Sequence, residues 1–124
     1  MTKDNIDIFE KLSGQLISVY EEISLLSKKS PNDAVNKFKL KFINKLILES
    51  NKYLSSKYKP FDDFDSFEED DIPKNGDVVF ILSQYIQCFE KFRSDNVSQR
   101  HGYWYWDTDD ELKIQTVKPK RLKD

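Results

Sequence analysis

Hydrophobic residues between positions 30 and 58 recur at spacings of three, four and seven, which place them on one side of a helix. The pair Ser30-Pro31, with Asp33 close behind, is a typical helix start, because Ser caps the helix and Pro tolerates the first turn. The apolar face is wide enough for two neighbours, so we predict that residues 31–58 form the central helix of a bundle. Its two stripes are Val35, Phe38, Phe42, Leu46 and Tyr53, and Leu40, Ile43, Ile47 and Leu54.

Two further segments show helical periodicity, at residues 4–29 and 78–95. Gly14 in the first segment costs about 1 kcal/mol of helix stability relative to Ala. We expect that this cost is explained by the close approach of a neighbouring helix at this position. Asp77 is placed to cap the second segment, whose apolar residues form the seam of a helix packed lengthwise on others. The two apolar sets are Phe9, Leu12, Leu16, Val19 or Tyr20, Ile23 and Leu26, and Val78, Leu82, Tyr85, Phe89 and Phe92.

The C-terminal part of the chain changes to the period of a strand. Residues 103–106 read Tyr-Trp-Tyr-Trp, and residues 112–117 alternate between apolar and polar side chains. The acidic stretch 107–110 suits a turn, so we expect a β-hairpin at about 103–117, followed by a basic tail at 118–124.

The register of this hairpin decides whether the two Trp side chains are surface or core. A loop of even length places them on the face of Lys113 and Glu111, as an exposed patch for a partner. A loop of odd length places them with Leu112 and Ile114, in the core. The cost of exposing a Trp ring favours the core arrangement.

Composition agrees with one folded domain spanning residues 1–124. The chain has 38% apolar, 34% charged and 14% aromatic residues, and this share of aromatics is unlike that of disordered chains. We therefore predict a mainly α fold: a three-helix bundle, a long acidic loop between the second and third helices, and a C-terminal two-stranded β-hairpin. The net charge of −2 argues against nonspecific nucleic-acid binding by the molecule as a whole.

Cellular location is indicated by features that the sequence lacks. The single cysteine, Cys88, cannot form an internal disulfide, and no apolar stretch has the length of a signal peptide core or a membrane span. We expect a cytoplasmic protein that does not interact with membranes.

The segment 61–76 is the most unusual part of the sequence. Phe61, Phe64 and Phe67 are spaced by three, and we expect their rings to hold a long loop against the bundle while the acidic side chains face outward. The acidic residues are Asp62, Asp63, Asp65, Glu68, Glu69, Asp70 and Asp71.

Residues that commonly carry chemistry are scarce. His101 is the only histidine and lies beside Gly102 in an expected turn, and no nucleophile, phosphate-loop or zinc motif is recognisable. The stretch 63–67 begins like a calcium loop, but no Gly follows at the required place. We therefore expect no catalytic residues, no metal site and no cofactor.

The acidic loop with its Phe residues, together with the lack of catalytic motifs, favours a noncatalytic protein that binds and blocks a basic protein partner. Its most specific form is an immunity protein that neutralises a nuclease-type toxin, an analogy from charge and size. The expected partner-binding residues are Asp62, Asp63, Asp65, Glu68, Glu69, Asp70, Asp71, Trp104 and Trp106.

Several alternatives remain open at this point. The acidic loop could be solubilising only, or could be neutralised internally by the row Lys37, Lys41 and Lys45; we weigh this equally with docking. A nucleic-acid-binding regulator ranks below protein binding, and a small hydrolase ranks third. The nucleic-acid alternative would use the aromatic hairpin with Lys118, Lys120, Arg121 and Lys123. The partner's identity and the oligomeric state do not follow from the sequence.

Overall fold

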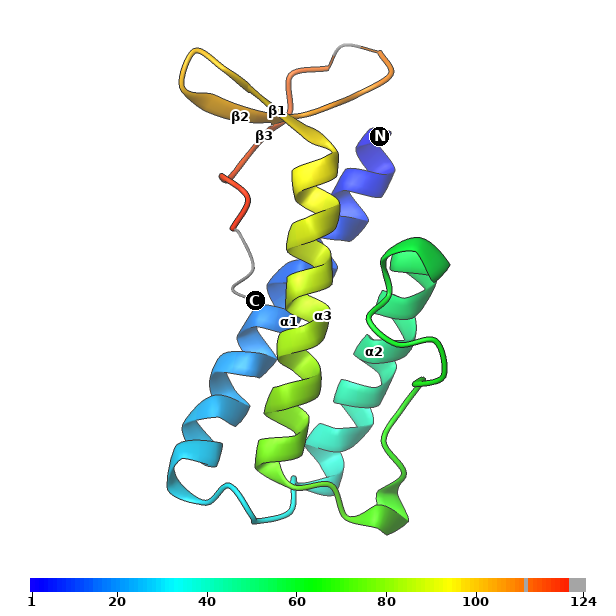
Figure 1. The fold of residues 1–124 in the computed structure, drawn as a ribbon, viewed down its shortest axis with the longest axis vertical. Helices are drawn as coiled ribbons and strands as arrows, with labels where there is room; N and C mark the ends of the chain where they lie inside the picture. The colour runs from blue at the N-terminus through cyan, green and yellow to red at the C-terminus, as the bar shows by residue number, and fades with distance from the viewer. Residues whose placement is uncertain (111, 121–124) are drawn as a thin grey trace.

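The computed structural model describes residues 1–110 and 112–120, and within them a helical bundle carries a small β-sheet at one end (Figure 1). Three α-helices are described, α1 (Lys3–Lys29), α2 (Lys37–Tyr58) and α3 (Asn75–Asp95), with a 3₁₀ helix, η1 (Glu69–Asp71), before α3. The described strands are β1 (Val97–Arg100), β2 (Tyr103–Trp106) and β3 (Gln115–Thr116). The prediction of a mainly α fold is confirmed. None of these helices is long and apolar enough to cross a membrane.

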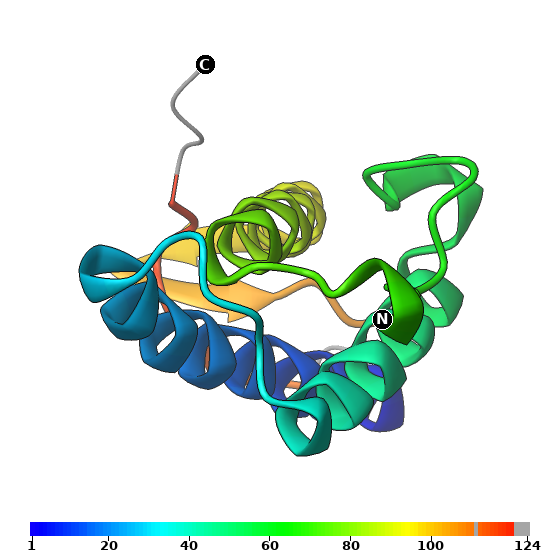
Figure 2. The same cartoon turned by 90° about the horizontal axis from the view of Figure 1, so that it is seen from below.

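The central helix is α3, which lies against both α1 and α2 (Figures 1 and 2). Its predicted seam is confirmed, because Val78, Leu82, Tyr85 and Phe89 are all buried and Phe92 is half-buried. The two neighbours predicted for the helix at residues 31–58 are confirmed, because α2 contacts both α1 and α3, but α3 packs more extensively and takes the central place. On α2 the stripe Leu40, Ile43, Ile47 and Leu54 is buried, but Phe38 and Phe42 of the other stripe are exposed.

The start of α2 also differs from the prediction. Ser30 ends α1, and α2 begins only at Lys37, where the Asn36 side chain accepts hydrogen bonds from the backbone N–H of Phe38 and Lys39. Residues 31–33 form a turn, and Ala34 then forms an isolated antiparallel bridge with Lys74, immediately before α3. The backbone N–H of Val35 donates to Pro73 O at 2.9 Å. These long-range hydrogen bonds override the local helix signal.

Two smaller helix predictions are also wrong. α3 begins at Asn75, so Asp77 lies in its first turn and does not cap it. Gly14 is exposed, and a Cβ atom built there would meet nothing within 4 Å. No described helix approaches it closely, and its presence has no packing explanation.

The sheet has the order β1-β2-β3 in the described residues, with both pairs antiparallel. Strand β1 was not predicted; it joins β2 through His101 and Gly102, whose positive φ angles of 52° and 85° suit a tight hairpin turn. The expected hairpin is present between β2 and β3, but β3 has only two residues.

The register places Trp104 opposite Thr116, and the Trp106 N–H donates to Ile114 O at 2.9 Å. An odd number of residues therefore lies between the paired positions 106 and 114, and both Trp side chains share the face of Ile114. The core arrangement is confirmed for Trp106, which is 2% exposed, whereas Trp104 is half-buried. Glu111, which the even register would have placed beside the Trp rings, lies outside the described residues.

Candidate functional site

Residues 59–74 connect α2 to α3 and contain all seven acidic residues of the predicted loop, and we call this connection the acidic segment. It lies beside α2, on the side away from α1 (Figures 1 and 2). Phe64 and Phe67 pack against the hydrophobic core, as predicted from their spacing. The three Phe rings also contact one another, with centroids 6.1 Å apart for Phe61 and Phe64 and 5.2 Å apart for Phe64 and Phe67. The aromatic side chains therefore fix the path of the segment.

Two asparagines of α2 hold the backbone of this segment. Asn44 Nδ2 donates to Phe67 O at 3.0 Å, and the Phe67 N–H donates to Asn44 Oδ1 at 2.8 Å. Asn51 Nδ2 donates to Phe64 O at 3.0 Å, and Asn51 Oδ1 accepts from Tyr85 Oη at 2.7 Å. Burial raises the pKa of Tyr85 to about 12, so this hydroxyl remains a donor at neutral pH.

Neither asparagine was predicted as a functional residue. Asn44 and Asn51 are seven residues apart, so they share one side of α2, and Asn51 is buried. Polar residues at this spacing beside an apolar stripe were the available signal, because a buried amide needs hydrogen-bond partners.

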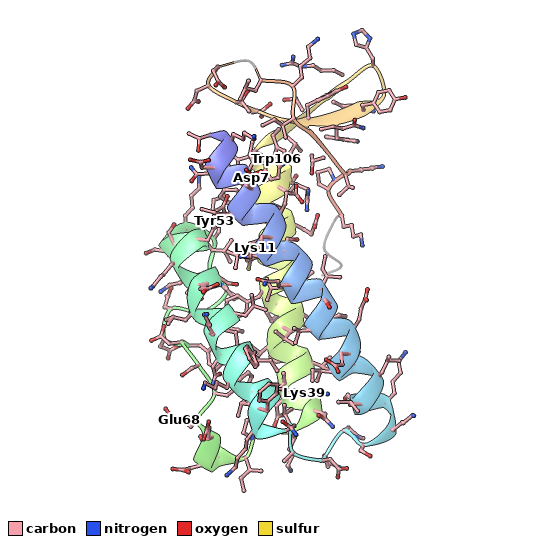
Figure 3. The ribbon with its side chains drawn as sticks, turned by 180° about the vertical axis from the view of Figure 1, so that it is seen from behind. Asp7, Lys11, Lys39, Tyr53, Glu68 and Trp106 are labelled. Carbon is pink, nitrogen blue, oxygen red and sulfur yellow. The ribbon has the colours of Figure 1, made fainter. Side chains whose placement is uncertain are left out.

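All seven acidic side chains of the segment are exposed: Asp62, Asp63, Asp65, Glu68, Glu69, Asp70 and Asp71. Figure 3 shows Glu68 at the outer edge, pointing away from the helices. Among the described residues, no ion pair within 4.0 Å joins these carboxylates to Lys37, Lys41 or Lys45. The internal neutralisation considered from the sequence is therefore not observed as direct pairing.

Ile72 follows the last carboxylate and has an unusual conformation. Its φ of 50° lies in the left-handed region, where a β-branched residue is strained, and its side chain is 62% exposed. An exposed apolar side chain thus adjoins Asp70 and Asp71. Strain of this kind is frequent at ligand-binding positions, and no sequence pattern indicated it.

Trp106 lies beneath the sheet (Figure 3), in a polar cluster whose members Trp106, Arg93 and Glu90 are buried and whose member Glu10 is partly exposed. Glu10 Oε1 accepts from Trp106 Nε1 at 3.1 Å and from Arg93 Nη1 at 3.0 Å. The Arg93 guanidinium is 4.9 Å from the Phe9 ring centroid, and its Nε is 3.6 Å from Glu90 Oε1. These contacts attach the sheet to the bundle, so Trp106 offers a partner almost no surface.

Trp104 lies on the border of an open hollow of about 1060 Å³, between the end of α3 and the segment after β3. Lys91 lines this hollow and pairs with Asp95 at 3.1 Å, whereas the backbone N–H of Lys120 donates to Glu90 Oε2 at 3.1 Å. The hollow is also lined by Lys118. Of the two Trp residues predicted to contact a partner, only Trp104 is therefore partly accessible. It belongs to strand β2 and is not part of the acidic segment.

The residues that could carry chemistry are dispersed. His101 is exposed in the β1–β2 turn, and burial raises the pKa of the Cys88 thiol, which makes it a weaker nucleophile at neutral pH. Within residues 1–110 and 112–120, no group of three or more His, Cys, Asp or Glu side chains is placed to hold a metal ion.

Comparison with protein-family models, with curated proteins and with solved structures finds no match to this chain.

Proposed function

We propose that the carboxylates of residues 62–71 form a docking surface for a basic partner protein. The chain itself would act by binding this partner and blocking its activity. The observation that supports the proposal is the exposure of all seven acidic side chains on a segment held by Phe packing and by Asn44 and Asn51. A segment fixed before binding loses less conformational entropy when a partner docks.

Electrostatics and one apolar contact would have different roles in this interaction. Clustered carboxylates speed association with a cationic surface and present acceptors for Arg and Lys. Ile72 supplies an exposed apolar side chain next to them, which suits the desolvated centre of an interface. An immunity-type inhibitor of a basic nuclease is the most specific form of this function, and it rests on analogy of charge and size.

The test compares two variants that change the net charge equally. The first neutralises loop residues as Glu68→Gln, Glu69→Gln, Asp70→Asn and Asp71→Asn. The matched control neutralises four other exposed acids as Asp7→Asn, Glu21→Gln, Asp33→Asn and Asp110→Asn. Proteins captured from the native source by the wild-type chain are identified by mass spectrometry, and their association rates are measured as a function of salt concentration.

We expect the loop variant to associate at least about tenfold more slowly and with a weaker salt dependence, while the control resembles the wild type. Asn44→Ala keeps all the charges but removes both hydrogen bonds to Phe67, so it should weaken binding through a faster dissociation rate. Equal rates for the loop variant and the wild type would contradict the proposal.

A second candidate, binding of single-stranded nucleic acid, is favoured by the position of Trp104 beside Lys118 and Lys120. The sheet and η1 lie at opposite ends of the long axis, which lessens repulsion between a bound phosphate backbone and the acids of η1 (Figure 1). Titration with a mixed-sequence oligonucleotide should then quench Trp fluorescence, and Trp104→Phe should abolish that change. A gel shift independent of Trp104 and of Lys118 would exclude this site.

A further inference from the structure

Residues of α1 and α2 line a shallow groove between the two helices. Figures 2 and 3 show these helices side by side, with α3 behind them. It consists of two adjoining hollows of about 400 and 410 Å³, which share Lys11, Gln15 and Glu49 in their walls. Figure 3 shows Lys11 and Tyr53 side by side within it. The groove is therefore continuous over several helical turns, from the N-terminal part of α1 to the first turns of α2.

The fold leaves apolar side chains uncovered in the groove and next to it. Phe38 and Phe42 are 71% and 54% exposed, and their rings contact each other with centroids 5.0 Å apart. Ile8, at the other end, is 48% exposed. Ile8, Leu12, Phe42 and Leu46 line the two hollows. Phe38 lies outside both linings and extends the apolar surface through its contact with Phe42. Apolar residues at both ends of one groove indicate a surface that is covered on binding.

The charge of the groove differs in sign from that of the molecule. Lys11, Lys45 and Lys52 line it, against one acidic residue, Glu49, although the net charge of the chain is −2. In the described part of the chain, no ion pair within 4.0 Å includes any of these three lysines. An occupant that carries acidic residues would therefore complement the groove.

Shape and charge together restrict the occupant. Two helices side by side, with apolar residues along the depression between them, fit a third helix that buries its apolar face there. A second copy placed groove to groove would bring lysines against lysines. The chain's own acidic segment is attached to the other side of α2 by Asn44 and Asn51.

We propose that the α1–α2 groove binds an amphipathic helix of a partner protein whose apolar face is flanked by acidic residues. This surface is separate from the acidic segment, and the two can be tested independently.

The probe is a fluorescein-labelled peptide of about 18 residues, roughly 27 Å long as a helix, with Leu at helical spacing and Glu on both flanks. A second peptide replaces every Glu with Lys. We expect micromolar binding of the Glu peptide, measured by fluorescence anisotropy, and at least about tenfold weaker binding of the Lys peptide.

Exposed phenylalanines provide matched variants. Phe38→Ser and Phe42→Ser together should weaken binding of the Glu peptide at least about tenfold, while Phe80→Ser, 57% exposed on α3, should leave it unchanged. Reversing the charge of the groove with Lys11→Glu, Lys45→Glu and Lys52→Glu should make the Lys peptide the better ligand. Circular dichroism confirms that each variant is folded.

Other results would overturn the proposal. No binding of the Glu peptide, equal binding of the two peptides, or binding indifferent to Phe38 and Phe42 would each contradict it. A concentration-dependent dimer in sedimentation that Phe42→Ser abolishes would identify a second copy as the occupant. The variant neutralised at residues 68–71 should bind the Glu peptide as the wild type does, so a failure of the acidic docking surface remains distinguishable.

Discussion

Gly14 lies exposed in the middle of α1, where Gly is about 1 kcal/mol less favourable than Ala. Because an added Cβ would meet nothing within 4 Å, Gly14→Ala should raise the free energy of unfolding by about that amount. Urea denaturation measures this as a higher midpoint with an unchanged slope. Gly102→Ala is the opposite control, since its φ of +85° strains any side chain and the variant should be less stable. A loss of stability in Gly14→Ala would contradict the exposure of this site.

At the C-terminal end of α3, Asp95 accepts hydrogen bonds from Tyr58 Oη at 2.8 Å and from Lys91 Nζ at 3.1 Å. The Tyr58 hydrogen bond, followed by that of Lys91, lowers the pKa of Asp95. Burial and the adjacent Asp95 raise the pKa of Tyr58. Stability from Asp95 is thus present above its unfolded pKa and lost as the pH falls through the lower folded value. For Tyr58 it is present below the unfolded pKa and lost as the pH rises through the higher folded value.

Tyr58→Phe removes one hydrogen bond and should raise the pKa of Asp95 towards its ordinary value. NMR titration of the Asp95 carboxyl carbon measures this directly. The stability difference between the variant and the wild type should disappear in acid, where the carboxyl is protonated in both. Lys91→Met should raise the same pKa as well, because it removes both a hydrogen bond and a nearby positive charge. An unchanged titration in Tyr58→Phe would show that the hydroxyl does not hold the carboxylate in solution.

At the scale of elements, Arg93, which is 3% exposed, helps to attach the sheet to the helices, because it donates to both Glu10 of α1 and Thr116 of β3. Arg93→Met would leave the carboxylate of Glu90, itself 5% exposed, buried without its cation, at a cost of about 3–5 kcal/mol. Adding Glu90→Gln should restore much of this stability, because a neutral amide costs less to bury. Trp106 fluorescence during urea unfolding measures both effects, since its indole bonds to Glu10 in the same cluster. Additive losses in the double variant would contradict the coupling.

Periodic elements were predictable and long-range pairings were not. The seam of α3 follows from local spacing alone, and so does α1 almost to its ends. Ser30-Pro31 did not start α2, because residues 33–35 instead exchange backbone hydrogen bonds with Pro73 and Asn75, about forty positions away. Strand β1 was missed although His101-Gly102 followed by an aromatic strand was a usable hairpin signal.

For the acidic segment, the sequence indicated which residues are exposed but not what holds them. The Phe spacing predicted packing against the bundle, and Phe64 and Phe67 do pack there. The hydrogen bonds from Asn44 and Asn51 depend on how α2 is rotated towards the segment, which requires the tertiary structure. The exposure of Phe38 was likewise unpredictable, because the helical pattern alone does not say which stripe a neighbour covers.

At the scale of the whole molecule, charges of one sign gather without direct partners of the other. Seven carboxylates lie within residues 62–71, and the groove lysines Lys11, Lys45 and Lys52 lie on the other side of α2. Among the described residues, no ion pair within 4.0 Å neutralises either set. Like charges held close together lower stability, a cost that proteins frequently retain where a binding function needs it.

Salt should therefore stabilise this protein. Raising NaCl from about 20 mM to about 300 mM shortens the screening length enough to weaken repulsion within the acidic segment, for a gain on the order of 0.5–1 kcal/mol. The variant neutralised at Glu68, Glu69, Asp70 and Asp71 should be more stable than the wild type at low salt and should gain less from added salt. The charge-matched variant that leaves the segment intact should keep the wild-type salt response, which separates local repulsion from net charge. Thermal unfolding measures all three proteins under the same conditions. A wild type that loses stability as salt rises would mean that the protein's own basic side chains already compensate the carboxylates. The acidic segment would then have little unsatisfied charge to offer a basic partner.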